Sequence, residues 1–191
     1  DSGDSSVTFS WVSSGINTTI DGSVNIKSNN KYNIKYKDTD GNEHVTNVGG
    51  ALFSLGGKTT IEKDVNIEKS SLSITPIAGA INNKWFSIAD SGKAQINGNA
   101  KFTDGSLDVL GNLSIKGDLS LDNSLLSLTS YTTFYNDGKE EKQQYTDHAS
   151  IGVGGNLKIS GVTDDGSTIY NTVAGDAILN VAGNVDVSGS N

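Results

Sequence analysis

One stretch of the sequence, from Gln95 to Thr129, constrains the fold more than any other. Its apolar residues come in pairs two positions apart, which is the side-chain period of a β-strand, and successive pairs follow at steps of six or seven residues. Gly, Asn or Asp residues, which tolerate the positive φ of tight corners, separate the pairs. The pairs are Ala100/Phe102, Leu107/Val109, Leu113/Ile115, Leu119/Leu121 and Leu126/Leu128.

Strands at this spacing are too close together for an ordinary sandwich, in which turns recur about every 8–12 residues. A step of six or seven residues fits one side of a triangular coil, and three sides give a turn of about 20 residues. We therefore predict an all-β fold, a parallel β-helix whose turns stack on one another with the apolar pairs inside. Tandem Ig-like β-sandwiches are the alternative fold.

A longer phrase occurs three times: an Asp-Gly turn, a polar arm, an alternating strand, a Gly corner and a second alternating strand. The corners are at Gly56-Gly57, Gly154-Gly155 and Gly183. Because Asp-Gly between two β-rich runs is a strong hairpin signal, we expect β-hairpins to leave the coil. They are expected near residues 32–46, 131–146 and 162–172, and residues 1–191 then form a single β-solenoid segment.

Charge and composition exclude several classes of partner. The chain has 14 basic and 22 acidic residues, and its net charge of -8 argues against binding to nucleic acid or to anionic membranes. No apolar stretch approaches the roughly 20 residues of a membrane helix, so we expect no membrane insertion by this segment. A signal peptide and Met are both lacking, so we expect the chain to be part of a longer precursor.

Phrases of the form Gly-Asn-hydrophobic-x-hydrophobic, such as Gly111-Asn112-Leu113-Ser114-Ile115, recur at Gly155 and Gly183. They resemble the rungs of bacterial haemagglutinin-type exoproteins, which include filamentous-haemagglutinin-like two-partner secretion adhesins and autotransporter passengers. The resemblance covers mainly the second half of the chain. It implies a right-handed parallel β-helix that is secreted, associated with the outer membrane and displayed at the bacterial cell surface as a virulence factor. The implied partner is a host-cell receptor, a matrix protein or a glycan.

No residue pattern indicates catalysis, and we predict that the chain is not an enzyme and has no cofactor. Glycoside hydrolysis needs two acids held about 5–10 Å apart, whereas the adjacent acids Glu140-Glu141 and Asp164-Asp165 fall at predicted turn tips. The chain has no Arg and no Gly-x-Ser-x-Gly elbow.

Metal binding is not expected either. Without Cys, and with only His44 and His148 in non-equivalent polar arms, a structural zinc site has too few ligands. The run Asp38–Glu43 resembles a calcium loop, but its Gly and Glu stand at the wrong positions for an EF-hand. Calcium bound by stacked Asp side chains at the corners remains a minor alternative.

Tyrosines in the predicted hairpins are the best candidates for contact with a partner. Tyr provides rigid contact area with a polar tip, and the candidates are Tyr36, Tyr135, Tyr145 and Tyr170. The alternative is that these side chains pack across the strands of their own hairpins. Asn17 and Asn112 begin Asn-x-Ser/Thr motifs and are candidate glycosylation sites, although Asn112 also suits a predicted corner.

The sequence therefore favours a structural and adhesive segment of a surface adhesin. One alternative is a polysaccharide-binding or polysaccharide-degrading β-helix. A carbohydrate-active β-helix, which turns over a polysaccharide, would need a groove lined with acids and aromatic residues on one face. Another is a self-assembling scaffold, because uncapped ends of a solenoid expose ladder edges that can stack.

Overall fold

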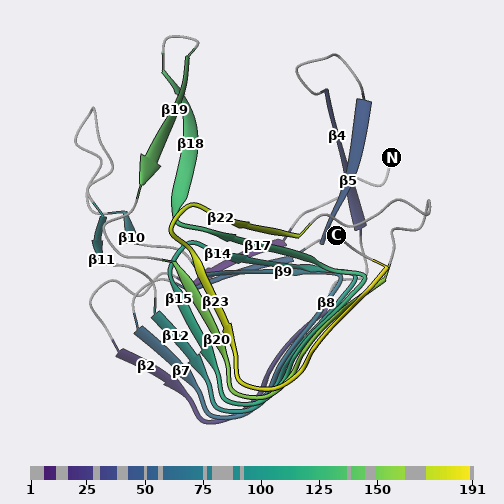
Figure 1. Cartoon of the computed structure of the whole chain (residues 1–191), viewed down its shortest axis with the longest axis vertical. Helices are drawn as coiled ribbons and strands as arrows, with labels where there is room; N and C mark the ends of the chain where they lie inside the picture. Colours follow the sequence, from purple (N-terminus) through teal and green to yellow (C-terminus); the bar gives the residue numbers. More distant parts are fainter. Residues whose placement is uncertain are drawn as a thin grey trace.

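A computed structural model describes most of the chain, and every element in the described part is a β-strand, which confirms the all-β prediction (Figure 1). No helix long and apolar enough to cross a membrane occurs in that part. The described residues are 7–11, 17–27, 31–37, 43–49, 51–55, 58–74, 77–78, 88–90, 93–136, 139–144, 149–161 and 171–189.

Eighteen of the strands form three parallel sheets of six strands each. Sheet A contains β1 (Val7–Trp11), β6 (Ala51–Leu55), β9 (Ser71–Ile74), β14 (Ser106–Val109), β17 (Leu125–Thr129) and β22 (Thr172–Ala174). Sheet B contains β2 (Asn17–Ile20), β7 (Lys58–Ile61), β12 (Lys93–Ile96), β15 (Asn112–Ile115), β20 (Ser150–Val153) and β23 (Ile178–Val181). Sheet C contains β3 (Val24–Lys27), β8 (Val65–Glu68), β13 (Ala100–Thr103), β16 (Leu119–Asp122), β21 (Leu157–Ser160) and β24 (Val185–Ser188).

The chain visits sheets A, B and C in turn, so that the three sheets are the sides of a triangular coil (Figure 1). In the uninterrupted turn, Asn99 and Asp118 occupy equivalent positions 19 residues apart, close to the expected period of about 20. This arrangement confirms the parallel β-helix. The alternative of Ig-like sandwiches is wrong, because such sandwiches are built from antiparallel sheets and these three sheets are parallel. The hand of the coil stays a prediction.

The core runs along the inside of the coil. Side chains alternate between the interior and the surface along a strand, and all five apolar pairs predicted from the sequence are buried. Phe102, for example, is 0 % exposed. Equivalent residues of successive turns stack into columns, because the strands pair in register. One such column in sheet C contains Val65, Ala100, Leu119 and Leu157.

Two of the three expected hairpins are confirmed. Strand β4 (Lys31–Lys37) pairs with β5 (Glu43–Gly49), and β18 (Tyr131–Asn136) pairs with β19 (Lys139–Gln144), both antiparallel. Most of the third expected hairpin, near 162–172, lies outside the described residues. A short antiparallel pair that the sequence analysis did not predict joins β10 (Ile77–Ala78) to β11 (Ile88–Asp90).

These excursions leave the coil at the two corners that flank sheet A. The β4–β5 hairpin connects sheet C to sheet A, whereas the β18–β19 hairpin connects sheet A to sheet B (Figure 1). As a result, the strands before and after Gly56-Gly57 in the sequence belong to sheets A and B, whereas those before and after Gly154-Gly155 belong to sheets B and C. The second and third phrases are equivalent here, because their alternating strands both run from sheet B to sheet C, whereas the strands of the first phrase run from sheet A to sheet B.

The corner between sheets B and C has no excursion and contains three residues in every turn; we call it the BC corner. Its members are 21–23, 62–64, 97–99, 116–118, 154–156 and 182–184. From the second turn onward, an Asp or Asn at the third position accepts a hydrogen bond through Oδ1 from the third backbone N–H of the next turn. The bonds are Asn99 N to Asp64 (2.7 Å), Asp118 N to Asn99 (2.9 Å), Asn156 N to Asp118 (2.7 Å) and Asn184 N to Asn156 (2.9 Å).

This side-chain ladder explains the Gly of the phrases at Gly155 and Gly183, whereas Gly111 lies at the corner between sheets A and B. A Cβ on the middle residue would collide with the Asp or Asn Oδ1 of the turn below and with backbone next to it, as at Gly98, Gly117 and Gly155. These glycines do not have positive φ. Positive φ occurs at other corners instead, for example at Asp104 (φ 50) and Asn123 (φ 48) between sheets C and A and at Gly175 (φ 73) between sheets A and B. Glycine is thus required at the BC corner by close approach and not by backbone conformation.

Candidate functional site

The outer surface of sheet B, here called the B face, carries two rows of outward-facing residues, most of which are polar. Each row runs along the coil with one residue per turn, about 4.8 Å apart, because the parallel strands are in register. The first row contains Asn17, Lys58, Lys93, Asn112, Ser150 and Ile178. The second row contains Thr19, Thr60, Gln95, Ser114, Gly152 and Asn180.

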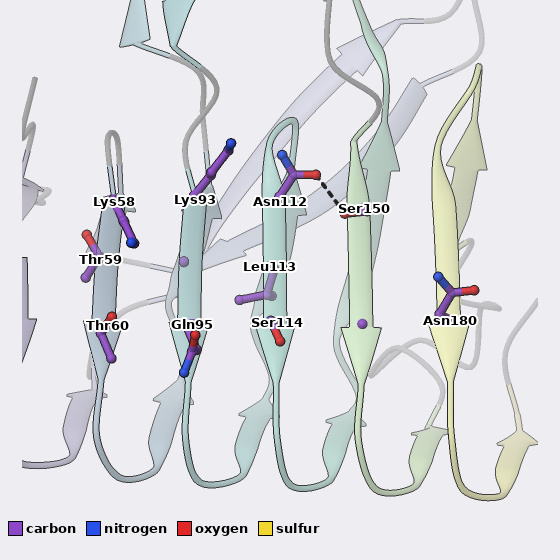
Figure 2. A pocket seen from close by; sticks show the side chains of 12 residues that line it. Lys58, Thr59, Thr60, Lys93, Gln95, Asn112, Leu113, Ser114, Ser150 and Asn180 are labelled. Atoms are coloured by element: carbon purple, nitrogen blue, oxygen red, sulfur yellow. Dashed lines mark hydrogen bonds between the residues drawn. The ribbon is translucent and has the colours of Figure 1, made fainter. Parts of the chain in front are cut away.

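A shallow, open hollow of about 340 Å³ lies on this face over β7, β12, β15, β20 and β23. Figure 2 shows the labelled polar side chains of the two rows standing side by side across it. Ser150 Oγ donates a hydrogen bond to Asn112 Oδ1 at 2.7 Å, which fixes both groups in the first row. Gly152 contributes no side chain, and a Cβ built there would meet nothing within 4 Å. The hollow therefore has space above Gly152 and hydrogen-bonding groups around it.

The charge of the B face differs from that of the whole chain. None of the twelve outward residues in the two rows is acidic, and the only charged ones are Lys58 and Lys93, both exposed. By contrast, the outer surface of sheet C carries both signs and includes an ion pair of 2.9 Å between Lys27 and Glu68. In a chain with a net charge of -8, the B face is thus the described sheet surface with a local excess of positive charge.

The composition of the hollow limits its chemistry. Its lining contains amide, hydroxyl and ammonium groups but neither a carboxylate nor an aromatic ring. The lining therefore lacks the acid pair that glycoside hydrolysis requires. It also lacks the acids and aromatic residues expected in the groove of a polysaccharide-degrading β-helix. What the arrangement provides is hydrogen-bond donors and acceptors at a regular spacing.

The candidate tyrosines do not form one cluster in the described backbone. Tyr36 lies in β4 opposite His44, and Tyr135 lies in β18 opposite Glu140, on hairpins that leave the coil at different corners. Tyr145 and Tyr170 lie outside the described residues. Partner contact through these residues stays a prediction.

Both candidate glycosylation residues lie in the first row of the B face. Asn17 begins β2 and is exposed. Asn112 begins β15, so its placement at a corner was wrong by one position, because the tight corner between sheets A and B ends at Gly111. The Asn112 side chain is partly exposed and accepts the bond from Ser150.

The structure also bears on the acids and histidines considered from the sequence. His44 belongs to strand β5 and not to a loop, whereas His148 and Asp164-Asp165 lie outside the described residues. Glu140 and Glu141 are neighbours in β19 instead of turn-tip residues. The corner carboxylates of Asp64 and Asp118 accept backbone N–H groups, and the described residues contain no cluster of three or more potential metal ligands.

One acid elsewhere has a perturbed ionisation. Asp108 lies on the outer surface of sheet A in β14, where partial burial raises the pKa of its carboxyl above the ordinary 3.8, and a hydrogen bond with Ser127 opposes this shift. Asp108 and Ser127 are partners in the ladder between β14 and β17. Asp108 meets the Ser127 hydroxyl, but the described strands of this sheet contain no second acid and no His, Lys or Cys, so we do not place a reactive site there.

Fold and surface together define a β-solenoid with one polar, acid-free face and lateral hairpins at the two corners that flank sheet A. Comparisons of the chain with protein-family models, with curated proteins and with solved structures found no match.

Proposed function

We propose that this chain is a structural and adhesive segment of a secreted bacterial surface adhesin, and that the B face binds a glycan. The adhesive role and the location at the cell surface rest on the resemblance of the Gly-Asn phrases to haemagglutinin-type rungs. The observation that carries the choice of ligand is the pair of rows on the B face, in which amides, hydroxyls and ammonium groups occupy most of the positions.

A polysaccharide suits such a face for two reasons. Its hydroxyl groups recur along the chain, so that a regular ladder of donors and acceptors can engage several sugar units at once, and weak contacts then add up through multivalency. The absence of carboxylates from the two rows also removes repulsion from acidic sugars, which the rest of this acidic chain would impose. A protein receptor would more typically meet a surface with aromatic anchors, and the B face has none among its described residues.

The test is binding of the labelled 191-residue chain to immobilised neutral and acidic glycans, beside host cells and matrix proteins. Gly152→Glu places bulk and a negative charge in the hollow, where the added Cβ meets nothing within 4 Å, so the fold is retained. We expect it to weaken glycan binding by at least about tenfold. The matched control is Ser120→Glu, which adds the same side chain to sheet C between Lys101 and Lys158 and leaves binding unchanged.

A third variant distinguishes the B face from the hairpins. Replacing residues 133–142 with Asn-Gly shortens the β18–β19 hairpin but keeps the pairs Tyr131–Gln144 and Thr132–Gln143. We expect this variant to bind glycans as well as the intact chain does. If binding is lost here and kept in Gly152→Glu, the hairpins form the adhesive surface and the assignment of the B face is wrong. If the intact chain binds no glycan, the glycan proposal is wrong for this segment.

A further inference from the structure

Two lysines stand next to each other in the first row of the B face. Lys58 and Lys93 are partners in the ladder between β7 and β12, on strands about 4.8 Å apart, and both side chains are exposed. Figure 2 shows them at the same end of their two strands. Like charges at partner positions of a sheet repel each other, so this pair works against the pairing of the two strands.

The residues around the pair do not neutralise it. Along the first row, Asn17 lies on one side of the two lysines and Asn112 on the other. Gln95, which belongs to the second row, lies two residues after Lys93 on the same strand. The pair is therefore surrounded by amides, and neither row contains a carboxylate that could form an ion pair with it.

The acid that follows on the same strand is engaged elsewhere. Glu62 lies four residues after Lys58, roughly 13 Å away along an extended chain, and its Oε2 accepts a hydrogen bond of 2.6 Å from Asn97 Nδ2. Asn97 Oδ1 in turn accepts a hydrogen bond of 2.6 Å from Gln95 Nε2. This network holds Glu62 at the BC corner and fixes the Gln95 amide next to Lys93. Gln95 Oε1 accepts no hydrogen bond from any described residue.

We propose that the pair Lys58 and Lys93 binds the acidic group of a polysaccharide, a carboxylate or a sulfate ester, so that acidic glycans are the ligand class of the B face. The inference rests on the proposed function, because it names the kind of glycan that this face binds. A carboxylate or sulfate has oxygens for both ammonium groups and replaces their repulsion with two charge-assisted hydrogen bonds. Gln95 Oε1 is then placed to accept a hydrogen bond from a sugar hydroxyl.

The hollow distinguishes a glycan from other anions. It extends from the two lysines over β15, β20 and β23, where its lining consists of uncharged residues. A small inorganic anion would occupy only the lysine end of this hollow. A nucleic acid, with a phosphate on every unit, would need positive charge along the whole face. A polysaccharide supplies an acidic group for the lysines and hydroxyl groups for the uncharged part.

The test compares acidic polysaccharides with neutral counterparts of the same backbone. The probes are polygalacturonate and its carboxyl-reduced form, and dextran sulfate and dextran, so that the two pairs distinguish a carboxylate from a sulfate ester. We expect at least one acidic probe to bind the 191-residue chain about tenfold more tightly than its neutral counterpart, and this difference to shrink as salt is added. The net charge of -8 opposes binding of any polyanion, so a preference for the acidic probe has to come from a local site.

The decisive variant is Lys58→Gln combined with Lys93→Gln. It should weaken binding of the acidic probe by about tenfold or more and leave binding of the neutral probe unchanged. The matched control, Lys101→Gln combined with Lys158→Gln, removes the same charge from sheet C, where Ser120 separates the two lysines, and should bind like the unaltered chain. Urea unfolding should show that the Lys58 and Lys93 variant is at least as stable as the unaltered chain, because a repulsion is removed.

The outcomes separate this inference from the proposed function. If the neutral and acidic probes bind equally well and Gly152→Glu weakens both, the B face binds glycans but its ligand class is not acidic. If the control variant loses as much acidic binding as the Lys58 and Lys93 variant, overall charge and not this pair is responsible, and the inference is wrong. If no glycan binds, the proposed function is wrong as well.

Discussion

Alanine at Gly117 should destabilise the coil far more than alanine at Gly22, although both glycines hold the middle position of a BC corner. At Gly117 the added Cβ would collide with Asn99 Oδ1 and lie 2.8 Å from Gly98 O, whereas at Gly22 it meets nothing within 4 Å. Neither residue has positive φ, so backbone conformation favours neither substitution over the other. The comparison therefore isolates the close approach between stacked turns.

The size of the effect follows from three contributions. Overpacking costs about 1–3 kcal/mol. Displacing the Asn99 side chain also breaks its bond to Asp118 N, which costs roughly 1 kcal/mol. Alanine also lowers the entropy of the unfolded chain, which stabilises the folded state by about 0.4–1 kcal/mol. Gly117→Ala should therefore lower the free energy of unfolding by about 2 kcal/mol. Gly22→Ala should raise it by up to about 1 kcal/mol, because only the lower entropy of the unfolded chain acts there.

Urea-induced unfolding followed by circular dichroism measures both differences. In the first BC corner the third residue is Ser23, and the middle residue of the next turn, Lys63, has a side chain. A second substitution, Asn99→Ser, reproduces this arrangement and should therefore relieve part of the cost of Gly117→Ala. If Gly117→Ala unfolds at the same urea concentration as the unaltered chain, or if both alanine variants shift the midpoint equally, the packing explanation of these glycines is incorrect.

Two other substitutions test the core and the perturbed acid. Phe102→Ala removes a side chain that is 0 % exposed, and urea unfolding should show a loss of about 3–5 kcal/mol; a loss below about 1 kcal/mol would contradict the assigned burial. The raised pKa of Asp108 means that its contribution to stability is fully present below the unfolded value, near 3.8, and is lost as the pH rises through the higher folded value. Asp108→Asn should therefore be more stable than the unaltered chain at pH 7, with the difference shrinking as the pH falls toward 3.8; a difference that does not change with pH would refute this.

The coil could be predicted from the sequence because its shortest turn is uninterrupted. In the stretch that contains Phe102 and Leu121, apolar residues alternate with a period of two, and corner residues recur every six or seven positions. A stack of short parallel strands satisfies both spacings. The two described hairpins were found for a similar reason, since an Asp-Gly pair between alternating runs is a local signal.

Contacts between turns could not be predicted in the same way. The reason for glycine at Gly117 is the side chain of Asn99, and which residues stack depends on the length of every excursion between them. The B face could not be predicted for the same reason. Lys58 and Lys93 are neighbours in the sheet, but the chain between them includes the β10–β11 pair, which the sequence did not predict. The members of the two rows stand at fixed distances before their BC corners, so they can be found from the sequence once those corners are known.

The turns of the coil differ in length, but the BC corner is the same in all of them. Equivalent residues at this corner are 35, 19, 38 and 28 residues apart in successive turns, yet every turn has three residues there and its strands stay in register. Extra sequence is thus inserted at the other two corners without moving the strands above or below. For evolution, a new loop costs the coil little; for protein engineering, Leu110-Gly111, the tight junction between β14 and β15, is a place where a foreign peptide can be grafted and displayed.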